Sequence, residues 1–126
     1  MNAVTVEQAA ALLEQADNIL ILTHRRPDGD TAGCAGALCR GLTQLGKTAY
    51  VLENPEITRR YAPLIVPCQA PADFKPQFVV STDVADDNML PQNAQIYVGH
   101  IDLTLDHHVS NPGIGKANLV RGTAGG

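Results

Sequence analysis

Apolar residues recur at helical spacing in two segments of this chain. Thr5 and Gln8 form a capping-box pattern, and the apolar positions behind them recur every three or four residues, which predicts a helix over residues 6–16. A second segment, rich in Ala, Leu and Gly, predicts a helix over residues 32–45 with Gly46 at its C-terminal cap. We expect this second helix to pack on a sheet.

Continuous apolar runs predict buried strands between and after these helices. Residues 19–23 are apolar without alternation, as expected for a strand that is covered on both faces of a parallel sheet. Residues 49–52 predict the next strand, which completes a β-α-β unit with a right-handed crossover. The remaining predicted strands are residues 78–82, 96–98 and 101–105. The predicted fold class is therefore α/β.

The length and composition predict one compact domain. The chain has 126 residues, of which 44% are hydrophobic, and this is enough material for a single core. Between Asn54 and Pro76 five prolines interrupt the pattern, which leaves a short helix near residues 57–64 and predicts a connection rather than a domain boundary. The tail 121–126 carries no stop signal, so we expect the fold to continue beyond it.

The charge and the cysteines limit the classes of protein that remain. A formal net charge of −4 disfavours a protein that holds extended nucleic acid on a broad basic surface, although acidic residues that bind divalent cations reverse the local field. No apolar run reaches the length of about 20 residues that a membrane helix needs, and no signal-peptide pattern opens the chain. The chain has three cysteines, an odd number. Together with the lack of a signal-peptide pattern and of a membrane helix, this number predicts a soluble cytoplasmic protein with reduced thiols. The spacing of Cys34 and Cys39 fits no usual zinc pattern, so we interpret both as core thiols.

Three polar clusters follow predicted strands, and the first is His24-Arg-Arg-Pro-Asp28-Gly-Asp30. In a doubly wound sheet, ligands bind beyond the carboxyl ends of the strands, where the loops converge. One imidazole and two carboxylates on a single turn suit a divalent metal. The alternative is structural, because Pro-Asp-Gly is a common turn and Asp30 or Thr31 is a suitable cap for the next helix.

Each of the other two clusters follows a later predicted strand. Asp83 supplies a carboxylate that is positioned to bridge two metals if its strand lies beside the first one. Asp106-His107-His108 is the most specific cluster, because adjacent histidines behind a carboxylate are hard to explain as core or as a solvated face. The alternative for this cluster is a turn with two surface histidines.

Taken in order, the clusters resemble the motifs of the DHH phosphoesterase superfamily. The pattern is similar to that of its bacterial oligoribonuclease and 3'-phosphoadenosine-5'-phosphate phosphatase group in three places: His24-Arg-Arg-Pro-Asp28-Gly-Asp30, Ser81-Thr82-Asp83 and Asp106-His107-His108-Val-Ser-Asn111. The resemblance covers nearly the whole chain. It implies that residues 1–126 form the N-terminal part of a DHH domain, with a doubly wound, mainly parallel sheet and helices on both faces. A further aspartate motif and a separate C-terminal substrate-binding domain would follow Gly126.

The resemblance also implies a role for each matching residue. Two manganese ions are implied, with Mg²⁺ or Co²⁺ as alternatives, and their ligands would be His24, Asp28 and Asp83 for one ion and Asp30, Asp83 and His107 for the other. Asp106 would orient His107, since a ligating imidazole needs a partner on its other nitrogen. His108 would contact the scissile phosphate. Cys34 stands where the family commonly has serine.

The activity that this resemblance implies is two-metal hydrolysis of phosphoesters. Its substrates would be short oligoribonucleotides or 3'-phosphoadenosine-5'-phosphate, cleaved to mononucleotides, and the intact protein would be a cytoplasmic homodimer without membrane contact. Two alternatives remain open. In the first, the chain is a metal- or nucleotide-binding fragment with impaired catalysis. In the second, it is a non-catalytic α/β interaction domain in which the clusters are only turns and caps.

Overall fold

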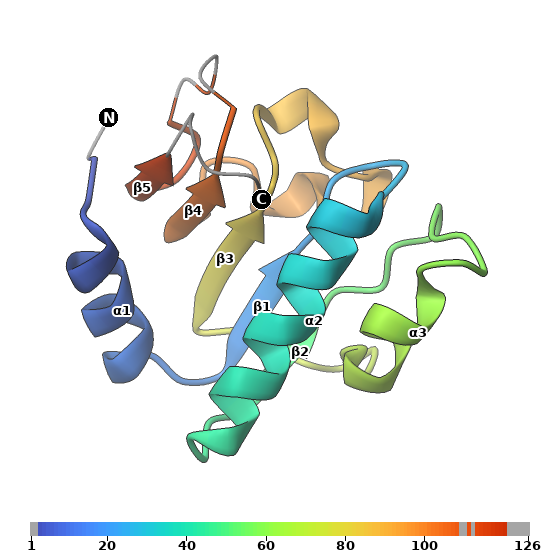
Figure 1. Ribbon diagram of the computed structural model, residues 1–126, viewed down its shortest axis with the longest axis horizontal. Coiled ribbons are helices and arrows are strands. Elements are labelled where there is room, and N and C mark those ends of the chain that lie inside the picture. Colours follow the sequence, from blue (N-terminus) through green and yellow to red (C-terminus); the bar gives the residue numbers. More distant parts are fainter. Residues whose placement is uncertain (1–2, 109–110, 112, 121–126) are drawn as a thin grey trace.

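The computed structural model describes residues 3–108, 111 and 113–120, and within them it contains a five-stranded sheet. The strand order is β2-β1-β3-β4-β5, and all four strand pairs are parallel (Figure 1). The strands are Ile19–Leu22 (β1), Ala49–Val51 (β2), Phe78–Thr82 (β3), Leu103–Asp106 (β4) and Ala117–Val120 (β5). The predicted α/β class with a parallel sheet is confirmed. The tail 121–126, in which the sequence shows no stop signal, lies outside the described residues, and so do residues 109 and 110 of the third motif.

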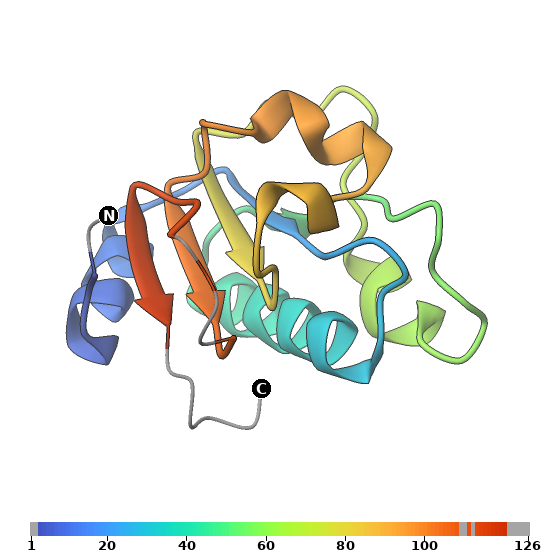
Figure 2. The same cartoon turned by 90° about the horizontal axis from the view of Figure 1, so that it is seen from above.

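The two faces of the sheet are covered by different kinds of helix. Figure 2 shows α1 (Val6–Gln15) and α2 (Gly29–Gln44) on one face, while the 3₁₀ helices η2 (Asp87–Met89) and η3 (Gln92–Tyr97) lie over the other. Beside α2 lie the short helix α3 (Ala62–Ile65) and the 3₁₀ helix η1 (Val66–Cys68). The expectation of helices on both faces is thus met, but the second face carries 3₁₀ turns rather than α-helices. No helix of the described part of the chain is both long and apolar enough to cross a membrane.

Alternate residues of β1 supply both halves of the core, which explains why the run carries no polar position. Ile19 and Ile21 belong to the cluster under α1 and α2, whereas Leu20 and Leu22 belong to the cluster under the 3₁₀ helices. All four are buried. Side chains alternate between the faces of a sheet, so a strand that is covered on both faces is apolar throughout.

Several element boundaries differ from the prediction. α2 begins at Gly29 rather than at residue 32, because the Asp28 side chain caps it by accepting a hydrogen bond from the Thr31 amide. The short helix expected at 57–64 lies later, as α3 and η1. The strand predicted at 96–98 is wrong, since this segment ends η3 in 3₁₀ turns. β5 was not predicted.

The strand order places the first and second motifs side by side. The chain leaves β1, reaches the edge strand β2 through α2, and returns to β3 on the opposite side of β1. The direction of the connections therefore reverses between β1 and β3, and such a switch point opens a crevice at the carboxyl ends of the two strands. Asp83 follows β3 directly, and His24 follows β1 after one residue.

Candidate metal centre

The loop after β1 presents one nitrogen of His24 to the centre. Asn54 anchors this loop from the segment after β2, since its Nδ2 donates to Thr23 Oγ1 at 2.8 Å and to the His24 carbonyl at 2.9 Å. His24 Nδ1 lies 2.6 Å from the Arg25 carbonyl oxygen, which can only accept, so Nδ1 carries the proton. The lone pair of Nε2 then faces the centre, as a metal-ligating imidazole requires.

Asp28 stands beside His24 at the start of α2. Its Oδ1 accepts a hydrogen bond from the Thr31 amide at 3.1 Å and lies 3.6 Å from His24 Nε2. The side chain is 58% exposed, so water and a substrate reach it easily. Asp30, in the first turn of α2, is also exposed.

Asp83 is the buried carboxylate at the middle of the centre. It follows β3 with a backbone φ of +60°, a left-handed conformation that is uncommon outside glycine and asparagine. Its Oδ2 lies 3.7 Å from His24 Nε2, and its Oδ1 lies 2.6 Å from His107 Nε2. Burial raises the pKa of Asp83, and nearby Asp28 adds to this, while His107, His108 and His24 act in the opposite direction.

The third motif brings two histidines to Asp83 at the end of β4. His107 Nε2 lies 2.6 Å from Asp83 Oδ1, and His108 Nδ1 lies 3.9 Å from the same oxygen. Asp106 Oδ1 lies 2.6 Å from His108 Nδ1, and its Oδ2 accepts a hydrogen bond from Asn111 Nδ2 at 2.7 Å. In the structure Asp106 pairs with His108, whereas the resemblance implied His107 as its partner.

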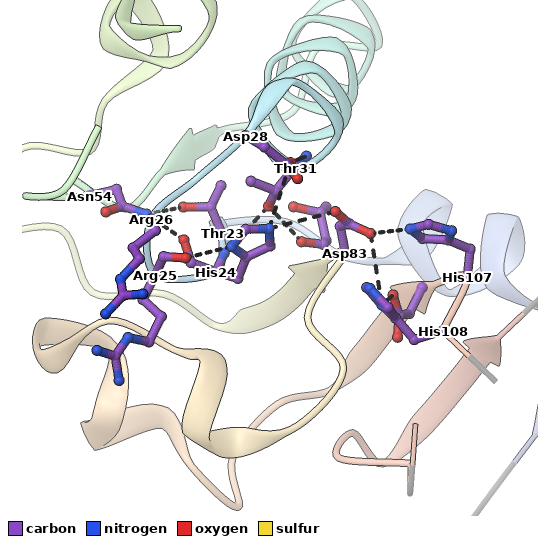
Figure 3. A network of polar contacts seen from close by, with 12 residues as sticks. Thr23, His24, Arg25, Arg26, Asp28, Thr31, Asn54, Asp83, His107 and His108 are labelled. Atoms are coloured by element: carbon purple, nitrogen blue, oxygen red, sulfur yellow. Dashed lines mark hydrogen bonds and ion pairs between the residues drawn. The ribbon is translucent and has the colours of Figure 1, made fainter. Parts of the chain in front are cut away.

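These side chains form two groups that share Asp83. The first contains His24, Asp28 and Asp83, and the second contains Asp83, Asp106, His107 and His108; in each group the potential ligand atoms lie within 4.8 Å of one another. Figure 3 shows His24 and Asp28 on one side of Asp83 and the two histidines on the other.

The chemistry of the shared carboxylate fits a bound cation. Asp83 Oδ1 is buried, and no described group donates a hydrogen bond to it, even though His107 Nε2 lies close by. A buried oxygen without a donor is costly unless a cation compensates it. Carboxylate and imidazole together suit divalent metals, and a carboxylate between two ligand groups can bridge two ions.

The comparison with known proteins agrees with this geometry. The model of the DHH family, N-terminal domain, matches residues 18–121, which include β1 and all three motifs. The chain belongs to the DHH family. A solved structure also shares the fold. It is an exopolyphosphatase-related protein from Bacteroides fragilis, which superimposes with a TM-score of 0.67 at 15% sequence identity. The match covers 92% of this chain and 38% of that protein's chain.

A curated relative is closer in sequence to this DHH domain. The bifunctional oligoribonuclease and PAP phosphatase NrnA of Thermus thermophilus is 34% identical over 103 residues, which are 81% of this chain. The chain spans about a third of that relative, since the match covers 31% of its length.

The DHH domain brings together four of the five expected metal ligands. His24, Asp28, Asp83 and His107 all belong to one or both groups, and the two other expected site residues, Asp106 and His108, belong to the second. Asp30 belongs to neither group of the described residues and stays a prediction.

Sequence analysis did not predict the hydrogen bonds through which several polar residues hold the site. Asn54, Thr31 and Asn111 are buried, and each makes hydrogen bonds to a segment that carries a ligand. Asn111 had a weak signal, its place in the third motif. The partners of Asn54 Nδ2 lie 30 or 31 residues away, so no local pattern indicates them.

The carboxylates also affect a thiol on α2. Burial raises the pKa of Cys34, and the charges of Asp83, Asp30 and Asp28 raise it further. A thiolate beside this group is therefore disfavoured, and Cys34 stays a thiol. The interpretation of Cys39 as a core thiol agrees with its burial and with its hydrogen bond to the Ala49 carbonyl oxygen.

Proposed function

We propose that this DHH domain is the metal-binding part of a phosphoesterase that hydrolyses short oligoribonucleotides or 3'-phosphoadenosine-5'-phosphate to mononucleotides. The observation that carries the proposal is the shared Asp83 carboxylate, whose two oxygens face different histidines. Two manganese ions are the proposed cofactors, with Mg²⁺ or Co²⁺ as alternatives. Such ions lower the pKa of bound water and neutralise charge on phosphoryl oxygens.

The two groups of side chains that share Asp83 assign the proposed ligands to two ions. His24, Asp28 and Asp83 would hold one ion, and Asp83 and His107 the other. Asp30 is a proposed ligand of the second ion from its motif alone. The lone pair of His24 Nε2 and the buried oxygens of Asp83 are already directed to the centre, so little reorganisation is needed on binding.

Asp106 and His108 would act on the substrate side. With Nδ1 against the Asp106 carboxylate, His108 has Nε2 left to hold a proton or donate it to a phosphoryl oxygen. The His108 side chain is 35% exposed, so a substrate can reach it, while the Asp106 side chain is fully buried. Asn111 fixes the second oxygen of Asp106 and thereby the orientation of the pair.

The substrate class rests on the relative. NrnA of Thermus thermophilus is named an oligoribonuclease and PAP phosphatase, and its match covers 81% of this chain. The negative charge of the chain agrees with local contacts to a small anionic substrate rather than with extended nucleic acid. A cytoplasmic homodimer is proposed for the intact protein on the resemblance alone.

One pair of measurements on the chain tests the proposal. Manganese is titrated calorimetrically into the protein, and the release of AMP from a short oligoadenylate and from 3'-phosphoadenosine-5'-phosphate is followed with manganese present. Binding of two ions with AMP release supports the phosphoesterase. His108→Ala should abolish AMP release while manganese still binds, because His108 is assigned to the substrate rather than to an ion.

A binding module without turnover is the second candidate. It is favoured by one observation, that the chain spans 31% of the relative's length, so groups that complete the active site of the relative can lie outside the matched segment. Manganese binding without AMP release would support this candidate. Absence of manganese binding would contradict both.

A further inference from the structure

Thr31 is a fully buried polar residue in the first turn of α2. It lies where three segments of the metal centre meet: the loop after β1, the N-terminus of α2 and the end of β3. Figure 3 shows its side chain between Asp28 and Asp83. A hydroxyl in such a position must find partners inside the protein, because burial without hydrogen bonds is costly.

Each hydrogen bond of Thr31 reaches a different segment that carries a ligand. Its amide donates to Asp28 Oδ1 at 3.1 Å. Its Oγ1 accepts from the His24 amide at 3.4 Å and donates to the Thr82 carbonyl oxygen at 2.8 Å. Thr82 directly precedes Asp83, so one residue contacts or adjoins all three members of the first metal group.

We propose that Thr31 is a positioning residue, whose hydroxyl holds His24 and Asp83 in register with Asp28 for metal binding. The inference rests on the metal site of the proposed function. A hydroxyl both donates and accepts, so it can join the two strand ends in a way that a methyl group cannot. Groups behind the ligands commonly set metal affinity, because they fix the orientation of the ligands.

The local backbone explains why such a connection is needed. Asp83 has a left-handed conformation immediately after Thr82, and a strained residue persists only where its surroundings hold it. The Asp83 amide donates to the Leu105 carbonyl oxygen at 2.8 Å, which fixes the β4 side. The hydrogen bond from Thr31 to the Thr82 carbonyl oxygen fixes the opposite side, toward α2.

Two matched pairs of variants isolate the hydroxyl. The first pair is the wild type and Thr31→Val, whose side chains have nearly the same shape. The second pair is Thr31→Ser and Thr31→Ala, whose side chains are both small. In each pair, the second protein lacks the hydroxyl. Thr43→Val is the control, since Thr43 lies on the same helix and its hydroxyl donates to the Cys39 carbonyl oxygen far from the centre. Manganese affinity is measured by calorimetry on the full chain, and the thermal midpoint is recorded for each variant.

We expect manganese to bind about 10- to 100-fold more weakly to Thr31→Val than to the wild type, and to Thr31→Ala than to Thr31→Ser. Thr43→Val should bind as the wild type does. If Thr31→Val fails to fold, the serine and alanine variants still decide the question. Affinities within about twofold in each pair would overturn the inference.

A measurement without metal separates this inference from the proposed function. Amide hydrogen exchange at His24 and Asp83 should be faster in the metal-free Thr31→Val and Thr31→Ala proteins than in their hydroxyl-bearing partners, and unchanged in Thr43→Val. Wild-type protein that binds no manganese would contradict the proposed function. Equal exchange within each pair would contradict the role of Thr31.

Discussion

Asp83 combines three properties that disfavour the metal-free fold. Its backbone is left-handed, its side chain is buried, and its Oδ1 receives no hydrogen bond from the described residues. A left-handed residue other than glycine costs of order 1–3 kcal/mol, and an unsatisfied buried acceptor adds to this. Residues of this kind cluster at functional sites, so these costs support a binding role for the carboxylate.

Asp83→Asn should remove manganese binding from both groups. The substitution keeps the size of the side chain, and asparagine tolerates the left-handed conformation better than most residues do. The affinity should fall by more than about 100-fold, the upper end of what is lost when only a supporting residue is replaced. Calorimetric titration measures this, with Asp73→Asn, at an exposed loop position, as the control. Wild-type affinity in Asp83→Asn would contradict the shared-ligand geometry.

The same variant should make the metal-free protein more stable at neutral pH. Burial raises the pKa of Asp83, so the protonated carboxyl stabilises the fold fully below the unfolded pKa, and this contribution is lost as pH rises through the folded pKa. Above that pH the ionised group is a net cost, which asparagine lacks. Thermal denaturation of both proteins in chelator, from acid to neutral pH, should show the advantage of Asp83→Asn growing with pH.

Which residues meet at the candidate site was predictable, because their positions relative to the predicted strands carry the signal. His24, Asp83 and His107 each follow an apolar run, and parallel strands place such positions at one edge. The pairing of Asp106 with His108 was not predicted, because it depends on where β4 ends and on the side to which each residue points. The supporting role of Thr31 depends on a contact with Thr82, 51 residues away.

At the scale of elements, α2 connects the metal centre to the packing of α3. Its N-terminus carries Asp28, while Gly36 in its middle lies against the Leu64 carbonyl oxygen of α3. A Cβ on Gly36 would overlap this oxygen. The close approach explains why a helix interior keeps a residue that lowers helical stability.

Gly36→Ala should therefore destabilise the protein by about 1–3 kcal/mol, the usual cost of overpacking, since the backbone of α3 must move away. Gly41→Ala is the matched control on the same helix, because its Cβ would meet nothing within 4 Å. It should stabilise the protein by about 0.5–1 kcal/mol, because alanine favours the helix more than glycine does. Urea denaturation measures both changes. A destabilised Gly41→Ala protein would show that the effect at Gly36 is not one of packing.

The elements that sequence analysis missed are those without a clear apolar pattern. β5 contains Asn118, which is buried and makes hydrogen bonds to Gly115 through both its side-chain oxygen and its side-chain nitrogen. A buried polar residue in this position interrupts the apolar pattern that indicates a strand. The segment 96–98 is apolar, yet Ile96 is 73% exposed and the chain there turns in 3₁₀ helix. A short apolar run does not indicate burial by itself.

For the whole molecule, the strand order determines where the site is. Sequence analysis predicted strands and a parallel class, but not that β1 lies between β2 and β3, because such pairing joins segments that are far apart in the chain. This order puts the switch point between the first two motifs, and β4 adds the third beside Asp83. The site is thus shared by three strand ends, and metal binding should couple to the stability of the entire sheet.

Manganese should consequently raise the thermal midpoint of the whole chain. At a free concentration of about 100 times the dissociation constant, each ion that binds only the folded state adds about 2.7 kcal/mol. For a domain of this size that corresponds to several degrees, in a single transition rather than in a local one. Differential scanning calorimetry should show the increase in Gly41→Ala as in the wild type, and none in Asp83→Asn. If manganese instead shifted only one of two resolved transitions, the three strand ends would not unfold as one unit, and the coupling between the site and the sheet would be refuted.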